Sequence, residues 1–457
     1  MDKSLVIVET SDERRYRMLE VVRQYANELS KADDEHEAIR SRHANWYAGF
    51  SGRVDEAVRG PEGAAWAGRL ARELPNVRSA LSWSLDAEPE TALRIAGTLG
   101  HSWYRHGYVI EGHQWLEAAL ARTTGPGTPM RARALHIAGV LADERGLYER
   151  AEVLLDEGLS LWRSLGDSGN VATLLNSLGV VVYSTGDVDR SIALTEEALE
   201  IKRAHDDKRG IETSLSNLAE MLQSRGDLSR AQALLEENLA ASSERGDDWG
   251  VSLARLNLGI LAVDQEEPER AETLLAATLR TFWRHQDVHY TVDCLDAIGQ
   301  AYAARGDGMR AAKVLGAAGA ARKQLDVPVR LAERDRYERL IALSRRDLDE
   351  DTWNAAWTEG RKMSIDEAVE YALTAEPVAP EDQGIPWDRT EALTPRESEI
   401  AHLIARGLTN RSIASELSIS ERTVTTHVGR ILKKLNLHSR TGVAARMLDQ
   451  GRSSKQT

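Results

Sequence analysis

The stretch AGVLADERGLYERAEVLL, residues 138–155, returns four more times along the chain at intervals of forty residues. The later copies read LGVVVYSTGDVDRSIALT (178–195), LAEMLQSRGDLSRAQALL (218–235), LGILAVDQEEPERAETLL (258–275) and IGQAYAARGDGMRAAKVL (298–315). Each copy has a short turn between two segments whose apolar residues follow helical spacing, so each predicts a pair of helices. A weaker, earlier copy starts near Leu99, at an offset of thirty-nine residues.

Small residues recur on both sides of this turn, twelve positions apart, and would let the two helices of a copy pack closely. They are Gly139, Gly179, Ala219, Gly259 and Gly299 before the turn, and Ala151, Ser191, Ala231, Ala271 and Ala311 after it. Leucines at i and i+4 spacing give the second helix an apolar stripe. One hairpin cannot bury such a stripe alone, so the copies are expected to stack into a solenoid.

The repeat resembles the tetratricopeptide repeat over about residues 92–327. It departs from that family in its period, which is forty residues rather than roughly thirty-four, and in lacking the usual closing proline. We therefore expect longer helices and carry over no peptide-binding residues. Stacked repeats form a long concave surface, so an unknown protein or small-molecule ligand is expected in the repeat groove. The alternative is a structural spacer.

Prolines and composition mark the other boundaries. Pro377, Pro380 and Pro386 exclude a continuous helix after the repeats and their helical cap, which predicts a linker there. The predicted order is a front segment (1–90), about six repeats (91–327), a helical cap (328–374), the linker (375–392), a C-terminal module (393–450) and a tail (451–457).

The charge of the chain is unevenly distributed. Residues 393–457 contain eleven Lys and Arg against five Asp and Glu, a net charge of +6, whereas the whole chain carries −14. The remaining residues therefore carry −20. A basic end on an acidic body is typical of proteins that bind nucleic acid through that end.

The C-terminal module reads as four short helices. Thr394, Pro395 and Glu397 form a capping box with proline at the first helical position, and Gly407 ends that helix. Ser420 can cap the third helix. The residues predicted to be buried in the first two helices are Ile400, Leu403, Ile404, Ile413 and Leu417. A tight turn between the second and third helices matches a helix-turn-helix plan.

The third helix, residues 420–435, is amphipathic in an unusual way. One face carries Val424, Val428, Ile431, Leu432 and Leu435, and the opposite face carries Arg422, Thr426, Gly429, Arg430 and Lys433. No carboxylate follows Glu421 in this helix, whereas an ordinary solvated face mixes both signs of charge. A helix of this width fits the DNA major groove.

Residues 393–450 resemble the LuxR/GerE-type DNA-binding domain in their caps, turn, core and basic residues together. The resemblance implies double-stranded DNA as partner, a recognition helix at 420–435, a fourth helix (SRTGVAARMLDQ) that can serve homodimerisation on DNA, and RNA polymerase as a further expected partner. The expected DNA-binding residues are Thr409, Asn410, Arg422, Thr423, Thr425, Thr426, His427, Gly429, Arg430, Lys433, Lys434 and Arg440. Thr425 and Gly429 depart from common family residues, so the preferred DNA sequence is not carried over.

The front of the chain predicts a small β-hairpin, SLVIVET and RRYRML around a turn, followed by the helix EVVRQYANELS. It resembles the wing and last helix of the winged-helix part of signal-transduction ATPases, and a plain helical start is the alternative. No G-x-x-x-x-G-K-[ST] loop occurs in the chain, so we expect neither ATP binding nor hydrolysis. The chain would then correspond to the C-terminal part of such an ATPase regulator, without its nucleotide-binding domain.

Other chemistry has little support. His101, His106 and His113 have no carboxylate or cysteine at ligand spacing, and His285, His289 and Cys294 straddle a repeat junction. Both groups are therefore read as packed or surface residues rather than metal ligands. No catalytic constellation stands out, so we expect no enzyme activity, cofactor or metal. A single cysteine and the lack of a long apolar run predict a cytoplasmic protein without a membrane partner. The abundance of Arg over Lys, with much Ala, hints at a bacterial source.

The sequence thus predicts an all-α transcriptional regulator: a helical-hairpin solenoid, a four-helix helix-turn-helix domain and a small N-terminal β-hairpin. A protein-interaction scaffold whose terminal helices only dimerise is the alternative, and a direct DNA-binding assay separates the two.

Overall fold

The computed structural model describes residues 6–10, 14–18, 22, 25–26, 28, 35–58, 63–123, 127–374 and the single positions 400, 401, 403, 413 and 428. The chain divides into two units, Met1–Val378 and Ala379–Thr457. In the second unit Ile400, Leu403 and Ile413, all predicted to be buried, are buried. The twelve expected DNA-binding residues lie outside the described residues, so their roles stay predictions.

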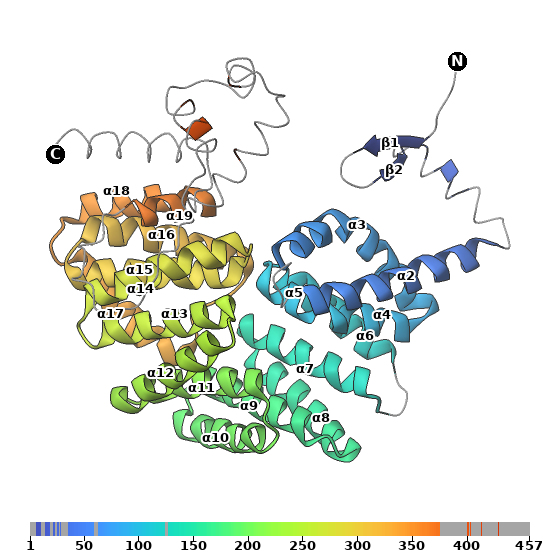
Figure 1. Cartoon of the computed structure of the whole chain (residues 1–457), viewed down its shortest axis with the longest axis horizontal. Helices are drawn as coiled ribbons and strands as arrows, with labels where there is room; N and C mark the ends of the chain where they lie inside the picture. The colour runs from blue at the N-terminus through green and yellow to red at the C-terminus, as the bar shows by residue number, and fades with distance from the viewer. Residues whose placement is uncertain are drawn as a thin grey trace. The chain divides into compact units, whose positions relative to one another are not determined.

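The first unit begins with two antiparallel strands and then continues as helices (Figure 1). Strand β1 (Val6–Thr10) pairs with β2 (Arg14–Met18), with Val8 opposite Tyr16. The helices before the forty-residue repeats are α2 (Glu35–Ala57), α3 (Gly63–Ala87), α4 (Pro89–Thr98), α5 (Gly100–Arg105) and α6 (Val109–Arg122). The resemblance of this front segment to a winged helix remains a prediction.

The repeats form a continuous series of helical hairpins. Their helices are α7 (Pro129–Glu144), α8 (Tyr148–Leu165), α9 (Ser168–Ser184), α10 (Val188–Ala204), α11 (Lys208–Ser224), α12 (Leu228–Glu244), α13 (Asp248–Asp264), α14 (Pro268–Arg284), α15 (Val288–Arg305) and α16 (Gly308–Leu325). The odd-numbered helices α7 to α15 contact one another in succession and form an inner layer. The solenoid predicted from the repeat is therefore present.

An aspartate begins most of the repeat helices, and it recurs every twenty residues. The caps are Asp167, Asp187, Asp207, Asp227, Asp247, Asp287 and Asp307, and each accepts the backbone N–H three residues later. Such a side chain satisfies one of the backbone donors that a helix leaves unpaired at its start. The residue before each cap has a positive φ, which ends the preceding helix with a left-handed turn. Half of the forty-residue repeat is thus one helix of 17 or 18 residues plus its turn.

The recurring small residues have the packing role that their spacing predicts. A Cβ at Gly259 would lie 2.7 Å from Leu275 Cγ, and one at Gly299 would lie 2.6 Å from Leu315 Cγ. The leucine of the second helix therefore occupies the space over the glycine of the first. Any side chain at these glycines would push the two helices of a hairpin apart.

Three more helices cover the end of the repeats. They are α17 (Arg334–Arg345), α18 (Glu350–Gly360) and α19 (Ile365–Leu373), preceded by the 3-10 turn η1 (Leu331–Glu333). Helix α18 packs on α16, and Trp353 and Ala356 form a small core with Ala312. Among the described residues no helix is long and apolar enough to cross a membrane.

Candidate functional site

The superhelix closes on itself through a buried ion pair. Arg105, at the end of α5, donates from Nε to Asp287 Oδ2 at 2.6 Å, and the two side chains are 6% and 0% exposed. Trp249 Nε1 donates to the same oxygen at 3.1 Å, and the Arg105 guanidinium lies 4.9 Å from the Trp249 ring centroid. One member of the aspartate series therefore caps α15 and also holds α5 against it.

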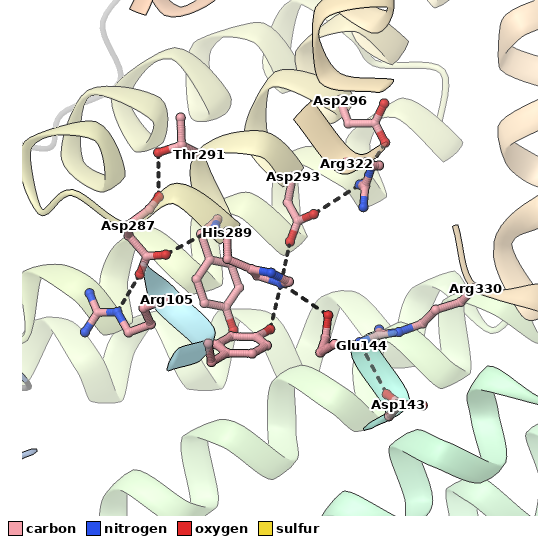
Figure 2. A network of polar contacts seen from close by, with 12 residues as sticks. Arg105, Asp143, Glu144, Asp287, His289, Thr291, Asp293, Asp296, Arg322 and Arg330 are labelled. Carbon is pink, nitrogen blue, oxygen red and sulfur yellow. Dashed lines mark hydrogen bonds and ion pairs between the residues drawn. The ribbon is translucent and has the colours of Figure 1, made fainter. Parts of the chain in front are cut away.

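A second set of polar contacts extends this junction inward (Figure 2). Tyr104 Oη lies 2.7 Å from His289 Nε2, which is also 3.4 Å from Asp293 and 3.7 Å from Glu144. Asp293 in turn accepts from Arg322 at 3.0 Å. His289, read from sequence as a packed or surface residue, therefore joins α5, α7 and α15 at one point.

Residues 326–333, which we call the strap, leave α16 and bridge the inner helices. The predicted helical cap therefore begins with a segment that is not helical up to Arg330. Arg330 reaches Glu144 on α7 with Nη2 at 3.2 Å and Glu220 on α11 with Nη1 at 3.1 Å. Asp326, at the start of the strap, accepts from Arg145 Nε at 3.1 Å. The strap therefore ties α7 to α11 across the inside of the superhelix.

The carboxylates around Arg330 are electrostatically perturbed. Burial raises the pKa of Asp143 to about 6, although Arg330 opposes the rise. Desolvation also raises the pKa of Glu220, again against the effect of Arg330. Burial alone would lower the pKa of Arg330, but Glu220, Glu144 and Asp143 raise it well above its ordinary value. Arg330 is thus a permanent cation among acids that compete for it.

A cavity of about 1350 Å³ lies within this closed turn. It is bounded by the inner helices and the strap, and many of its lining residues are polar or charged, among them His136, Asn176, Lys202, Glu220, Asn257 and Arg336. Arg336 is held against Asp264 at 2.8 Å, so the wall near the strap is rich in paired charges. The size and lining suit a small molecule or a short polar segment better than an apolar ligand.

Sequence reasoning did not identify Arg105, Asp287, Arg330 or Lys202 as site residues. The twenty-residue aspartate series is visible in the sequence and could have predicted the caps. Nothing local distinguishes Asp287 from the other caps, however, because its partner lies 182 residues earlier.

Comparison with known proteins supports the two resemblances. Residues 391–448 match "Bacterial regulatory proteins, luxR family", and residues 114–204 and 210–282 match "Tetratricopeptide repeat". The chain carries a LuxR-family segment. Tetratricopeptide repeats precede this LuxR-family segment, as the forty-residue pattern indicated.

Two curated relatives illustrate where the similarity lies. A Mycobacterium bovis protein named as an HTH-type transcriptional regulator, Mb0914c, is 35% identical over 129 residues, which are 28% of this chain and 14% of that protein. The nitrate/nitrite response regulator protein NarL of Escherichia coli K12 is 54% identical over 52 residues, which are 11% of this chain and 24% of that protein. The matched stretches thus span under a quarter of each relative's length.

Among solved structures, a Rap protein complexed with competence and sporulation factor aligns with 87% of this chain and 98% of its own. Its sequence identity is 13% and its TM-score is 0.47. A score below 0.5 carries no argument about function, so the cavity must be interpreted from its own residues.

Proposed function

We propose that this chain is a sequence-specific, DNA-binding transcriptional regulator whose repeat body binds a ligand or protein partner in the cavity. The observation that carries the proposal is the match of residues 391–448 to the luxR family, on a segment whose third helix has a basic, hydroxyl-bearing face. The named relatives are transcriptional and response regulators, which supports the same role.

The proposal includes binding as a homodimer to two half-sites. A single helix-turn-helix module buries only about 600–1,000 Å² of protein surface on DNA, which is small for tight, specific recognition. Two modules would double the contacts, and two-fold symmetry favours inverted half-sites about one helical turn apart. RNA polymerase is a further proposed partner of the DNA-bound dimer.

Selection from a pool of random DNA duplexes with the full chain tests this function. We expect an enriched inverted repeat, and protection of both half-sites in a footprint at saturation. A chain that enriches no sequence and binds duplex DNA only weakly would instead favour the scaffold alternative. Enrichment of a single half-site by a monomer would keep DNA recognition and reject the dimer.

A further inference from the structure

The cavity wall holds a buried lysine that forms no ion pair within the part of the chain that the structure describes. Lys202, in the last turn of α10, lines the cavity and is only 3% exposed. Its Nζ donates to Ser214 Oγ at 3.0 Å, and Ser214 Oγ donates to Asn176 Oδ1 at 2.9 Å. No carboxylate among the described residues forms an ion pair with Lys202, whose printed polar contact is to a neutral hydroxyl.

The other buried cations of this region are all paired. Arg105 has Asp287, Arg322 has Asp293 and Asp296, and Arg330 has Glu144 and Glu220. Burying a charge without a counter-ion is costly, which is why buried charges in proteins are normally paired. An unpaired lysine in the wall of a large cavity therefore indicates that the partner comes from outside the chain.

The charge of Lys202 persists at neutral pH. Burial lowers its pKa to about 8, and the neighbouring Asp207 opposes that lowering. Asp207 caps α11, with its Oδ1 accepting the backbone N–H of Gly210, and it forms no ion pair with Lys202. Lys202 is therefore mostly protonated at pH 7, with ammonium hydrogens that Ser214 does not use.

The side chains around Lys202 favour one negative charge. Burial, Lys202 and Arg133 lower the pKa of His136 to about 4, so its ring is neutral at pH 7, and its Nε2 lies 2.8 Å from Ser177 Oγ. Arg133 is already paired with Asp55 at 2.6 Å. Lys202 thus has neutral hydroxyl, amide and imidazole groups around it, and Asp207 acts on its charge without forming an ion pair with it. One cation in this setting matches a singly charged anion.

The acids around Arg330 lie further along the same helices, whereas the acids near Lys202 are Asp207 and Glu212, the latter paired with Arg245. Glu220 follows Ser214 by six residues on α11, which is about 9 Å of helix rise. Asp143 follows His136 by seven residues on α7. Both acids therefore lie toward the C-terminal ends of their helices, where Arg330 lies close to them. An anion would be repelled there, and Lys202 would retain it at its own end.

We propose that Lys202, held in place by Ser214 and Asn176, forms a subsite that binds a carboxylate group of the molecule occupying the cavity. The inference rests on the proposed role of the cavity as a ligand site, and it is independent of DNA binding. Lys202 supplies the charge, and Ser214 and Asn176 fix its ammonium group in place. A phosphate, which carries up to two negative charges, fits the single cation less well.

Lysine acylation of the full chain tests the subsite, with sodium acetate as the carboxylate probe. An N-hydroxysuccinimide ester modifies unprotonated amines, and peptide mass spectrometry reads the rate at each lysine. We expect acetate to slow modification of Lys202 about tenfold once it exceeds its Kd about tenfold, relative to chloride at equal ionic strength and pH. Lys208 is the internal control, because its side chain is 67% exposed and its ion pair is with Asp206.

The probes give distinct outcomes. Protection of Lys202 by acetate but not by inorganic phosphate supports the carboxylate subsite. Stronger protection by phosphate overturns the carboxylate assignment, and equal rates in acetate, phosphate and chloride overturn the subsite itself. A DNA-binding titration of the same preparation shows separately whether the proposed regulator function holds.

A variant of Lys202 provides a second test of the subsite. Lys202→Met keeps much of the side-chain volume and removes the charge, so the rise in Tm that acetate causes in the unchanged protein should disappear. An acetate-dependent Tm rise that persists in Lys202→Met would contradict the proposal. The acylation experiment needs no variant, so it decides the question even if Lys202→Met does not fold.

Discussion

Arg105 Nε lies 2.6 Å from Asp287 Oδ2, and this buried contact joins residues that are 182 positions apart. It connects the short helix α5, which precedes the forty-residue repeats, to the start of α15 near their end. The inner helices thereby surround the cavity rather than forming an open groove. The contact is thus the point at which the series of repeats closes around the cavity.

Removing the charge of Asp287 should destabilise the protein strongly. Asp287→Asn leaves Arg105 buried without a counter-ion, a change that costs about 3–5 kcal/mol in comparable buried pairs. Urea unfolding of the full chain measures the loss. Asp187→Asn is the matched control, because Asp187 caps α10 by the same bond to Arg190 N and Asn caps helices about as well as Asp. Similar losses in both variants would mean that Asp287 acts only as a cap.

The stability of the body should fall as pH rises across the pKa of Asp143. The folded-state pKa of about 6 lies above the unfolded value of about 3.9, so the folded state binds this proton more tightly. The contribution is present below pH 4 and is lost as pH rises through 6, by an amount of about 3 kcal/mol. Glu220, whose pKa is also raised, extends the decline to higher pH.

Comparison with Asp143→Asn isolates this effect, because asparagine does not titrate. We expect the difference in unfolding free energy between the variant and the unchanged protein to shift in favour of the variant as pH rises from 4 to 7. A difference that stays constant over that range would show that Asp143 titrates normally in the folded protein.

Replacing a strained residue at a helix end should stabilise the repeats. Glu266 has a φ of 61° at a position where the other turns of the series often have glycine. A residue other than glycine in this conformation destabilises the folded state by roughly 1–2 kcal/mol. Glycine removes this strain, but it also raises the conformational entropy of the unfolded chain, which offsets part of the stabilisation. We therefore expect Glu266→Gly to raise the unfolding free energy by about 0.5–1 kcal/mol.

The control for that substitution is Glu269→Gly, in the first turn of α14. Glycine inside a helix costs about 0.5–1 kcal/mol, so this variant should be less stable. Thermal unfolding of the two variants beside the unchanged protein shows whether stability rises in the first and falls in the second. A loss of stability in Glu266→Gly would refute the strain argument.

Two substitutions in the predicted recognition helix should separate base reading from phosphate contact. Thr426→Ala should change the preference at one base position by about 1–3 kcal/mol. Lys434→Ala should weaken binding to all sequences alike and lower the slope of log affinity against log salt by about one. Binding titrations against the selected site and its single-base variants, at two salt concentrations, distinguish the two patterns. A uniform loss in Thr426→Ala would place that residue on the backbone instead.

The repeat hairpins could be predicted because their signals are contiguous. The spacing of Gly139 and Ala151, repeated every forty residues, specifies two close helices and a turn within a single stretch of chain. The cap at each helix start depends only on an aspartate and the backbone three residues later. The LuxR resemblance rests likewise on one uninterrupted segment, 393–450, and its family match confirms it.

The cavity could not be predicted in this way. Seven aspartates cap repeat helices in the described part of the chain, and their sequences give no sign that Asp287 would meet Arg105. The same holds for Arg330, which reaches Glu144 from 186 residues away. Lys202 looks in sequence like any basic residue in the last turn of a helix, and only the packing of α9 and α11 buries it.

The sequence by itself therefore determined the repeating unit, its turns and the family of the C-terminal segment, because local spacing and capping act between neighbours in the chain. The tertiary structure alone decided which side chains meet across the superhelix. That outcome depends on the small rotation between successive hairpins, summed over the whole series. The sum brings α5 to α15, places the strap across α7 and α11, and buries a lysine that forms no ion pair among the described residues.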